Sequence, residues 1–73
     1  MISHADTAKY VSDLMLDISG RLDESVGIVK TACTSEEEAA YRRSIGRILG
    51  NILLEVLNPL YAEHPSLKPA GFE

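Results

Sequence analysis

Residues 32–38 have the sequence Ala-Cys-Thr-Ser-Glu-Glu-Glu, and this stretch decides the fold because it separates two long amphipathic segments. Thr34 and Glu37 have the spacing of a capping box, in which two side chains satisfy free N–H groups at a helix start. Ser35 and Glu38 have the same spacing. The consecutive glutamates lie in the first turn, where the helix dipole favours negative charge. The connection is short and lacks Gly and Pro, so we expect antiparallel neighbouring helices.

The segment before this connection is predicted to be a helix from about Asp6 to Ala32, with Ser3 or Asp6 as its N-cap. Its apolar residues recur at intervals of three and four and fall within an arc of roughly 120°, which is typical of a helix buried on one side. They are Val11, Leu14, Met15, Ile18, Leu22, Val26, Val29, Ala32 and Cys33.

The segment after the connection is predicted to be a helix from about Ser35 to Asn58. Its apolar arc spans about 180°, which is wider than one neighbouring helix covers. Asn58-Pro59 should end or kink the helix, because proline lacks an N–H group and disfavours the α conformation of the residue before it. One further turn could extend to residue 63. The apolar set is Tyr41, Ile45, Ile48, Leu49, Ile52, Leu53, Leu54, Val56, Leu57 and Leu60.

The chain has 73 residues, so it forms one domain at most. We expect an all-α antiparallel helical hairpin over residues 1–65 and an extended tail over residues 66–73, in which Leu67 or Phe72 could dock on the bundle. Small chains bury little of their surface and need a stabiliser. The chain has a single cysteine, which excludes an internal disulfide, so we expect two chains to pair as a four-helix bundle.

The wide arc of the second helix predicts where this pairing occurs. Gly46 and Gly50 lie four residues apart and could permit a close helix–helix approach, or they could be tolerated glycines. A second pair, Gly20 and Gly27, could form a second contact surface for a partner, but the favoured interpretation is two exposed glycines. The predicted oligomer interface consists of Ile45, Gly46, Leu49, Gly50, Ile52, Leu53, Val56, Leu57 and Leu60.

The open end of the hairpin is a second candidate region. If both helices rise equally per residue, residue i of the first helix lies at the same height as about residue 67 − i of the second helix. His4, Asp6, Glu63 and His64 could then converge, together with tyrosines, and bind a divalent metal or supply an acid and a base. Their spacing matches no known helical metal motif. We therefore predict no metal site, no cofactor and no catalytic residue, and these four residues are the only candidates.

Charge and composition exclude several classes of protein. The formal net charge of −4 disfavours nucleic acid as a partner. No stretch has the length and apolarity of a membrane span, and the N-terminal residues lack the features of a signal peptide. The single cysteine, Cys33, fits a reducing compartment, so a cytoplasmic protein is expected. Cys33 could be reactive at the helix start, or it could be a small buried apolar residue.

Three arginines, Arg42, Arg43 and Arg47, form a short basic stripe on the second helix. The expected register places them opposite acidic residues of the first helix. Ion pairs with Asp23 and Glu24 are therefore predicted, each contributing under about 1 kcal/mol if exposed.

The function that this pattern favours is a small non-enzymatic, homo-oligomeric interaction or regulatory module, which pairs as a homodimer and could bind another protein as a further partner. No nucleophile with an accompanying base can be named, so an enzyme is not expected. The alternative is a ligand- or metal-binding bundle that uses the open end of the hairpin.

Overall fold

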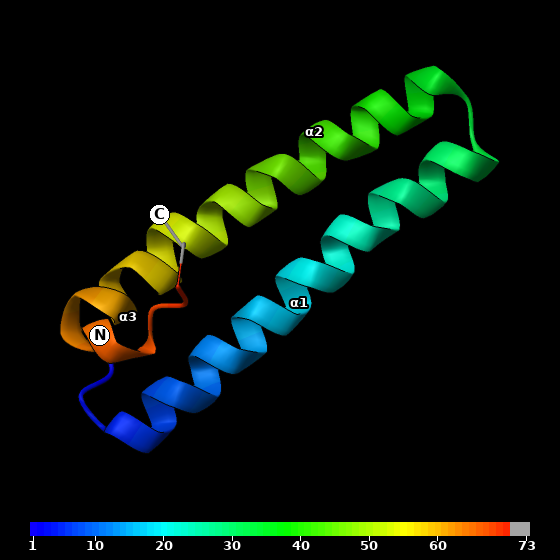
Figure 1. Ribbon diagram of the computed structural model, residues 1–73. Coiled ribbons are helices and arrows are strands. Elements are labelled where there is room, and N and C mark those ends of the chain that lie inside the picture. Colours follow the sequence, from blue (N-terminus) through cyan, green and yellow to red (C-terminus); the bar gives the residue numbers. More distant parts are fainter. Residues whose placement is uncertain (71–73) are drawn as a thin grey trace.

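The computed structural model describes residues 1–70, and within that range the chain is all-α. Two long helices, α1 (Ala5–Ala32) and α2 (Ser35–Asn51), lie antiparallel and are joined by a two-residue connection (Figure 1). The predicted helical hairpin is confirmed. After α2 the chain continues as a π-helical segment η1 (Ile52–Leu57), a short helix α3 (Asn58–Glu63) and a 3-10 turn η2 (Pro65–Leu67).

The connection is closed by the capping box that the sequence predicts at Thr34 and Glu37. The Thr34 hydroxyl accepts the Glu37 N–H at 3.1 Å, and the Glu37 carboxylate accepts the Thr34 N–H at 2.9 Å. Cys33 ends α1, where its N–H donates to the Val29 carbonyl at 2.9 Å. Cys33 and Thr34 are both extended, so two residues suffice to reverse the chain.

The N-cap of α1 differs from the prediction. His4 occupies this position, and its ring Nδ1 accepts the Thr7 N–H at 3.2 Å. Ser3 therefore lies outside the helix, and Asp6 lies in the first turn, where its charge suits the helix dipole. An imidazole nitrogen replaces the hydroxyl or carboxylate oxygen that usually caps a helix.

Pro59 reshapes the second helix without ending it. Its ring lacks an N–H group and would clash with the carbonyl of Glu55 in a regular α-helix. The preceding residues widen into η1 instead, and the Asn58 N–H donates to the Leu53 carbonyl five residues earlier. Pro59 then lies in the first turn of α3, where no N–H partner is required.

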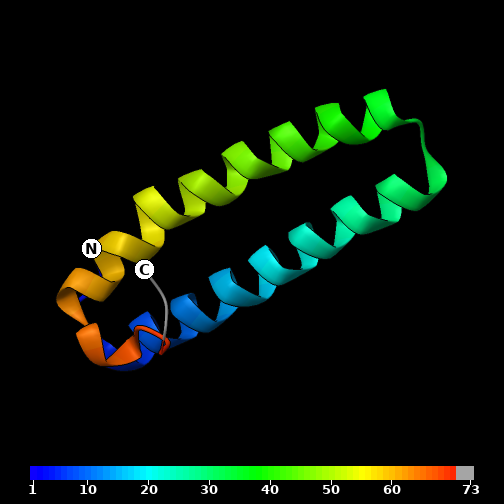
Figure 2. The same ribbon diagram turned by 45° about the horizontal axis from the view of Figure 1, so that its top comes forward.

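The chain after η1 turns toward the N-terminal end of α1 (Figures 1 and 2). The tail prediction therefore needs one correction, because residues 65–67 form a turn of 3-10 helix and are not extended. Leu67, one of the two predicted docking residues, is half-buried. Phe72, the other, lies outside the described residues.

The best-buried side chains gather where α3 meets α1. Leu60 is fully buried, and Leu57 and Tyr61 are nearly so. Ala8 and Ser12 are the buried residues of α1, and their small side chains permit a close approach. The hydroxyls of Ser12 and Tyr61 share a buried hydrogen bond of 2.6 Å. The core is thus concentrated at the open end of the hairpin.

A second hydrogen bond between hydroxyls joins the helices nearer the connection. Ser25 and Tyr41 share a part-buried contact of 2.7 Å, which is one residue from the expected register. Ser12 should lie level with residue 55, but its partner Tyr61 is six residues further along. The register departs from the expectation at this end because α3 turns back across α1.

The molecule is elongated, and for most of its length it is a single layer of two helices (Figure 1). Its principal extents are 44 × 20 × 16 Å, and the long dimension matches the rise of 28 residues in α1. The radius of gyration is 14.5 Å, against roughly 11 Å for a compact domain of this length. A single layer of helices therefore has open faces on both sides.

The buried hydroxyl pair should contribute more to stability than the outer one. Tyr61→Phe should lower the free energy of unfolding by about 1–2 kcal/mol, because the buried Ser12 hydroxyl loses this partner. Tyr41→Phe should cost less, because Ser25 is only part-buried and also donates to the Leu22 carbonyl. Urea denaturation measures both, and equal losses would contradict this ranking.

The capping box makes a separate prediction. Thr34→Ala should lower the free energy of unfolding by about 0.5–2 kcal/mol, because it leaves the Glu37 N–H without its cap. Thr31→Ala is the matched control, since this exposed hydroxyl donates only to the Ile28 carbonyl of its own helix. Thermal denaturation of both variants should show a clear loss for Thr34→Ala alone.

Candidate interaction surface

The hairpin leaves much of its apolar surface uncovered. The chain is 45% hydrophobic, yet within residues 1–70 only five apolar residues are buried: Ala8, Ile45, Leu57, Leu60 and Tyr61. Leu54 is 65% exposed, Ile28 68%, Tyr10 67% and Ile48 45%. The accessible surface is 5100 Å², against roughly 4,450 Å² for a compact protein of this mass. These exposed apolar residues form a candidate interaction surface.

Three residues of the predicted oligomer interface do not lie on this surface. Ile45, Leu57 and Leu60 are buried within the chain itself, so they offer little surface to a second copy. Ile45 faces α1, and the bend at Pro59 carries Leu57 and Leu60 into the core. The remaining members keep part of their surface. Leu49, Gly50, Ile52, Leu53 and Val56 are half-buried, and Gly46 is exposed.

A shallow open groove of about 270 Å³ lies along one side of α2 and η1. Its lining residues belong to one face of the helix, because they recur at intervals of three and four. Only Ile52 and Val56 were among the predicted interface residues. The row Ile48, Ile52 and Val56 was visible in the sequence as an i, i+4, i+8 pattern. The groove is lined by Ile48, Asn51, Ile52, Glu55 and Val56.

The glycines make no close approach within the chain. A β-carbon added at Gly46 or Gly50 would meet nothing within 4 Å, and the same holds for Gly20 and Gly27. Packing inside the hairpin therefore does not require any of the four.

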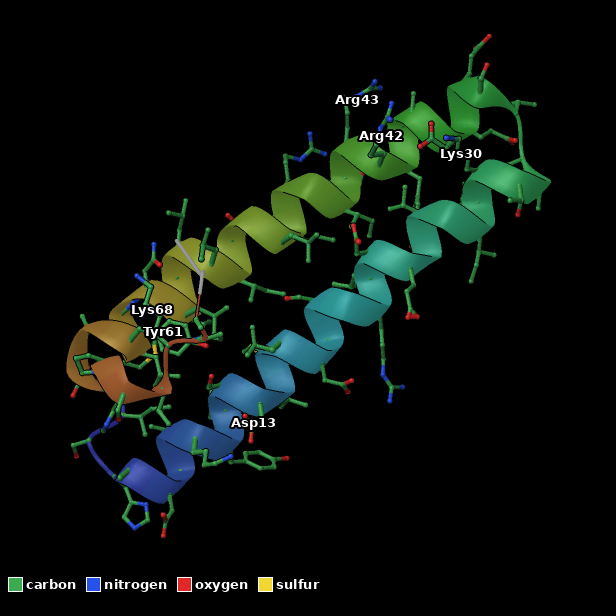
Figure 3. The ribbon with its side chains drawn as sticks, viewed as in Figure 1. Asp13, Lys30, Arg42, Arg43, Tyr61 and Lys68 are labelled. Atoms are coloured by element: carbon green, nitrogen blue, oxygen red, sulfur yellow. The ribbon has the colours of Figure 1, made fainter. Side chains whose placement is uncertain are left out.

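The arginine stripe does not pair with α1 as predicted. Arg42 pairs with Glu38 of its own helix at 3.6 Å, and no ion pair within residues 1–70 joins α2 to Asp23 or Glu24. In this pair the Arg42 side chain is 64% exposed, whereas the Glu38 side chain is 12% exposed. Figure 3 shows Arg43 projecting away from α1.

Charge pairs on α1 are likewise local. Lys9 donates to Asp13 at 2.8 Å, and Arg21 lies 3.2 Å from Asp17, each pair separated by one helical turn. The hydrogen bond and charge of Asp13 raise the pKa of Lys9 above 10.5. Both side chains are exposed, so any stabilisation from this pair is small, and it is lost as the pH rises through the raised pKa.

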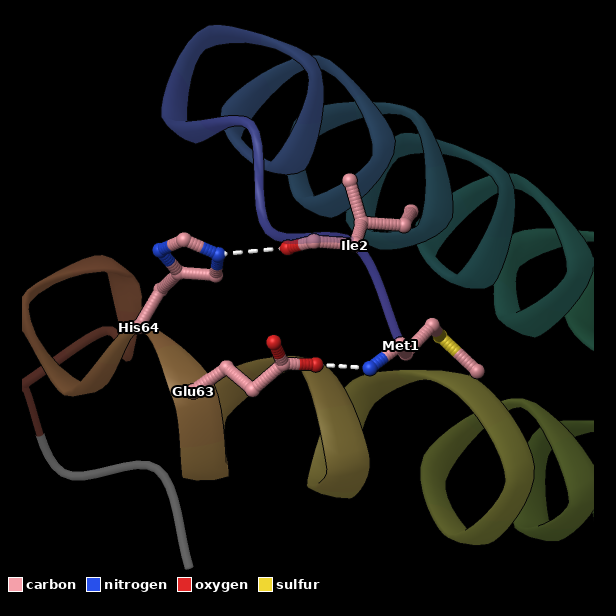
Figure 4. Close-up of polar contacts among 4 residues, drawn as sticks. All are labelled: Met1, Ile2, Glu63 and His64. Carbon is pink, nitrogen blue, oxygen red and sulfur yellow. Dashed lines mark hydrogen bonds and ion pairs between the residues drawn. The ribbon is translucent and has the colours of Figure 1, made fainter.

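At the open end, the candidate metal ligands contact other groups. The Nε2–H of His64 donates to the Ile2 carbonyl at 2.6 Å, and Glu63 pairs with the Met1 amino group (Figure 4). His4 instead caps α1. Across residues 1–70, no three His, Cys, Asp or Glu side chains gather in a way that could hold a metal ion. The structure therefore brings the N-terminal segment to Glu63 and His64 but does not gather the four candidate residues into one group of metal ligands.

Cys33 is a free, exposed thiol at the end of α1. The interpretation of Cys33 as a small buried apolar residue is therefore wrong.

Comparison with known proteins adds no relative. No protein-family model, no curated protein and no solved structure matches the chain. Among the described residues, none of the helices has both the length and the apolarity needed to cross a bilayer. The interpretation of the surface therefore depends on its geometry and chemistry.

Alanine at the glycines would show whether another chain packs against them. Each of Gly46→Ala and Gly50→Ala should stabilise the helix by about 1 kcal/mol, because the added methyl group enters open space. Gly20→Ala and Gly27→Ala are the matched controls on α1. Chemical denaturation of the four variants gives the gains. A smaller gain or a loss only at Gly46 and Gly50 would show a close approach by a second chain.

Proposed function

We propose that this protein is a homo-oligomeric interaction module, in which two hairpins stack face to face as a four-helix bundle. The observation that carries the proposal is the single layer of helices, 16 Å in its thinnest dimension, with large apolar side chains exposed on it. Domains are ordinarily built from at least two packed layers, because each layer must cover the apolar face of the other. A second copy supplies the missing layer.

Energetic considerations support the same proposal. Small domains bury too little apolar surface to be stable without a further stabiliser, and the described residues include only five buried apolar side chains. Covering an exposed Leu or Ile contributes about 1.5–3 kcal/mol per side chain. Burial of Ile48 by a second copy, together with the half-buried Ile52 and Val56, would add the stability that a single hairpin lacks.

The outer side of α1 offers a place for another protein. Tyr10 and Ile28 are both exposed and lie eighteen residues apart, which is five helical turns, so they share one face of the helix. This face carries the interaction role of the proposal. The alternative function, a ligand or metal bound at the open end, draws no support from the contacts of His4 and His64.

The proposal predicts the behaviour of the purified chain. Light scattering after size exclusion should give a mass of about twice the 8.0 kDa of one chain. The melting temperature should rise with protein concentration, because association stabilises the folded state by mass action. A folded species with the mass of one chain and a concentration-independent melting temperature would overturn the proposal.

A further inference from the structure

Two parallel rows of side chains run along the grooved side of α2 and η1. One row is polar and consists of Arg47, Asn51 and Glu55. The other is apolar and consists of Ile48, Ile52 and Val56. Five of these six residues line the groove, and Arg47 extends the polar row by one turn.

The π-helical segment keeps these rows straight. In an α-helix, side chains four residues apart drift by roughly 40° around the axis, because a turn takes 3.6 residues. A π-helix has wider turns and i→i+5 hydrogen bonds, so its drift over four residues runs the other way. The change from α2 to η1 falls between Asn51 and Ile52. The rotation over the second half of each row therefore opposes the rotation over the first half, and the third residue of the row lies nearly in line with the first.

We infer that this face is the seam between two copies of the chain, packed antiparallel about a two-fold axis near Asn51 and Ile52. This inference rests on the proposed function and names the surface through which it operates. A two-fold axis perpendicular to α2 brings each row against the same row of the second copy. Ile48 then packs on Val56 of the second copy, and the two Ile52 side chains meet on the axis.

The polar row has the charge pattern that this arrangement requires. Arg47 and Glu55 are exposed and lie eight residues apart, roughly 12 Å along the axis, so they do not pair within one chain. The two-fold axis brings Arg47 of each copy level with Glu55 of the other. The two Asn51 amides face each other between these pairs, where each can donate and accept. The charges of this row therefore match those of the same row in a second copy only when the two helices run antiparallel.

A second copy is also the occupant that the uncovered area favours. The hairpin exposes roughly 650 Å² more surface than a compact chain of its mass, and stable interfaces bury about 800 Å² per partner. If this face pairs with the same face of a second copy, each chain buries an equal share of the excess area. A groove for an unrelated peptide would have no need of matched opposite charges at positions 47 and 55.

Charge reversal tests the pairing in the full chain. Arg47→Glu and Glu55→Arg should each raise the dimer dissociation constant roughly tenfold, because each places like charges together at two sites. The double variant should return close to the wild-type value. The two single variants change the net charge in opposite directions, to −6 and −2 from −4, so overall repulsion cannot explain a loss in both. Lys30→Glu, far from the groove, is the control for Arg47→Glu.

Cysteine crosslinking tests the axis independently. In a Cys33→Ser background, Asn51→Cys should give a disulfide-linked dimer under mild oxidation, because the two copies of position 51 meet at the axis. Lys30→Cys in the same background should remain uncrosslinked. Sedimentation equilibrium and non-reducing gels provide the two measurements.

The outcomes separate the seam from the proposed function. A wild-type dimer whose dissociation constant is unchanged by either charge reversal, with no preferential crosslink at position 51, would overturn this seam and leave the oligomeric module standing. A wild-type monomer would overturn both. Loss in each single variant, recovery in the double variant and a crosslink specific to position 51 would establish the seam.

Discussion

The missing N–H group of Pro59 is the constraint on which the rest of this structure depends. A proline at this position cannot join a regular α-helix without a clash against the carbonyl four residues earlier. The chain accommodates it by widening the preceding six residues into a π-helix. The bend that results carries α3 across the first turns of α1, where Leu60 and Tyr61 become buried against residues as small as Ala8 and Ser12. The core of the protein exists because the helix is deflected.

The same deflection explains what the hairpin leaves open. The buried side chains are concentrated at one end, and the helices elsewhere are held by half-buried apolar residues and by the Ser25–Tyr41 contact. Hydroxyl pairs have defined geometry, so they specify the register of the two helices more narrowly than apolar contacts do. The wide apolar arc of α2 therefore keeps an outward part that α1 cannot reach. The π-helical turns align this outward part into straight rows, so one proline links the core to the candidate seam.

Sequence and structure agree for most features that residues close together in the chain decide, although the N-cap of α1 is His4 and not Ser3 or Asp6. The two long helices follow from apolar spacing, and the capping box at Thr34 and Glu37 was visible as a motif of four residues. The expected register holds within one residue at Ser25 and Tyr41, because little chain separates that contact from the connection. At the other end, the same rule failed by six residues. A rule of equal rise assumes two straight helices, and η1 and α3 depart from that assumption.

By itself, the sequence determined an all-α hairpin with an apolar arc too wide for one neighbour. Which part of that arc faces inward was decided by the tertiary structure, since the choice depends on how the bend at Pro59 rotates Leu57 and Leu60 toward α1. The tertiary structure also decided which groups the charged side chains contact. Arg42 pairs one turn away, and His4 caps its own helix. Spacing along a chain fixes which residues share a face, but only packing decides what that face contacts.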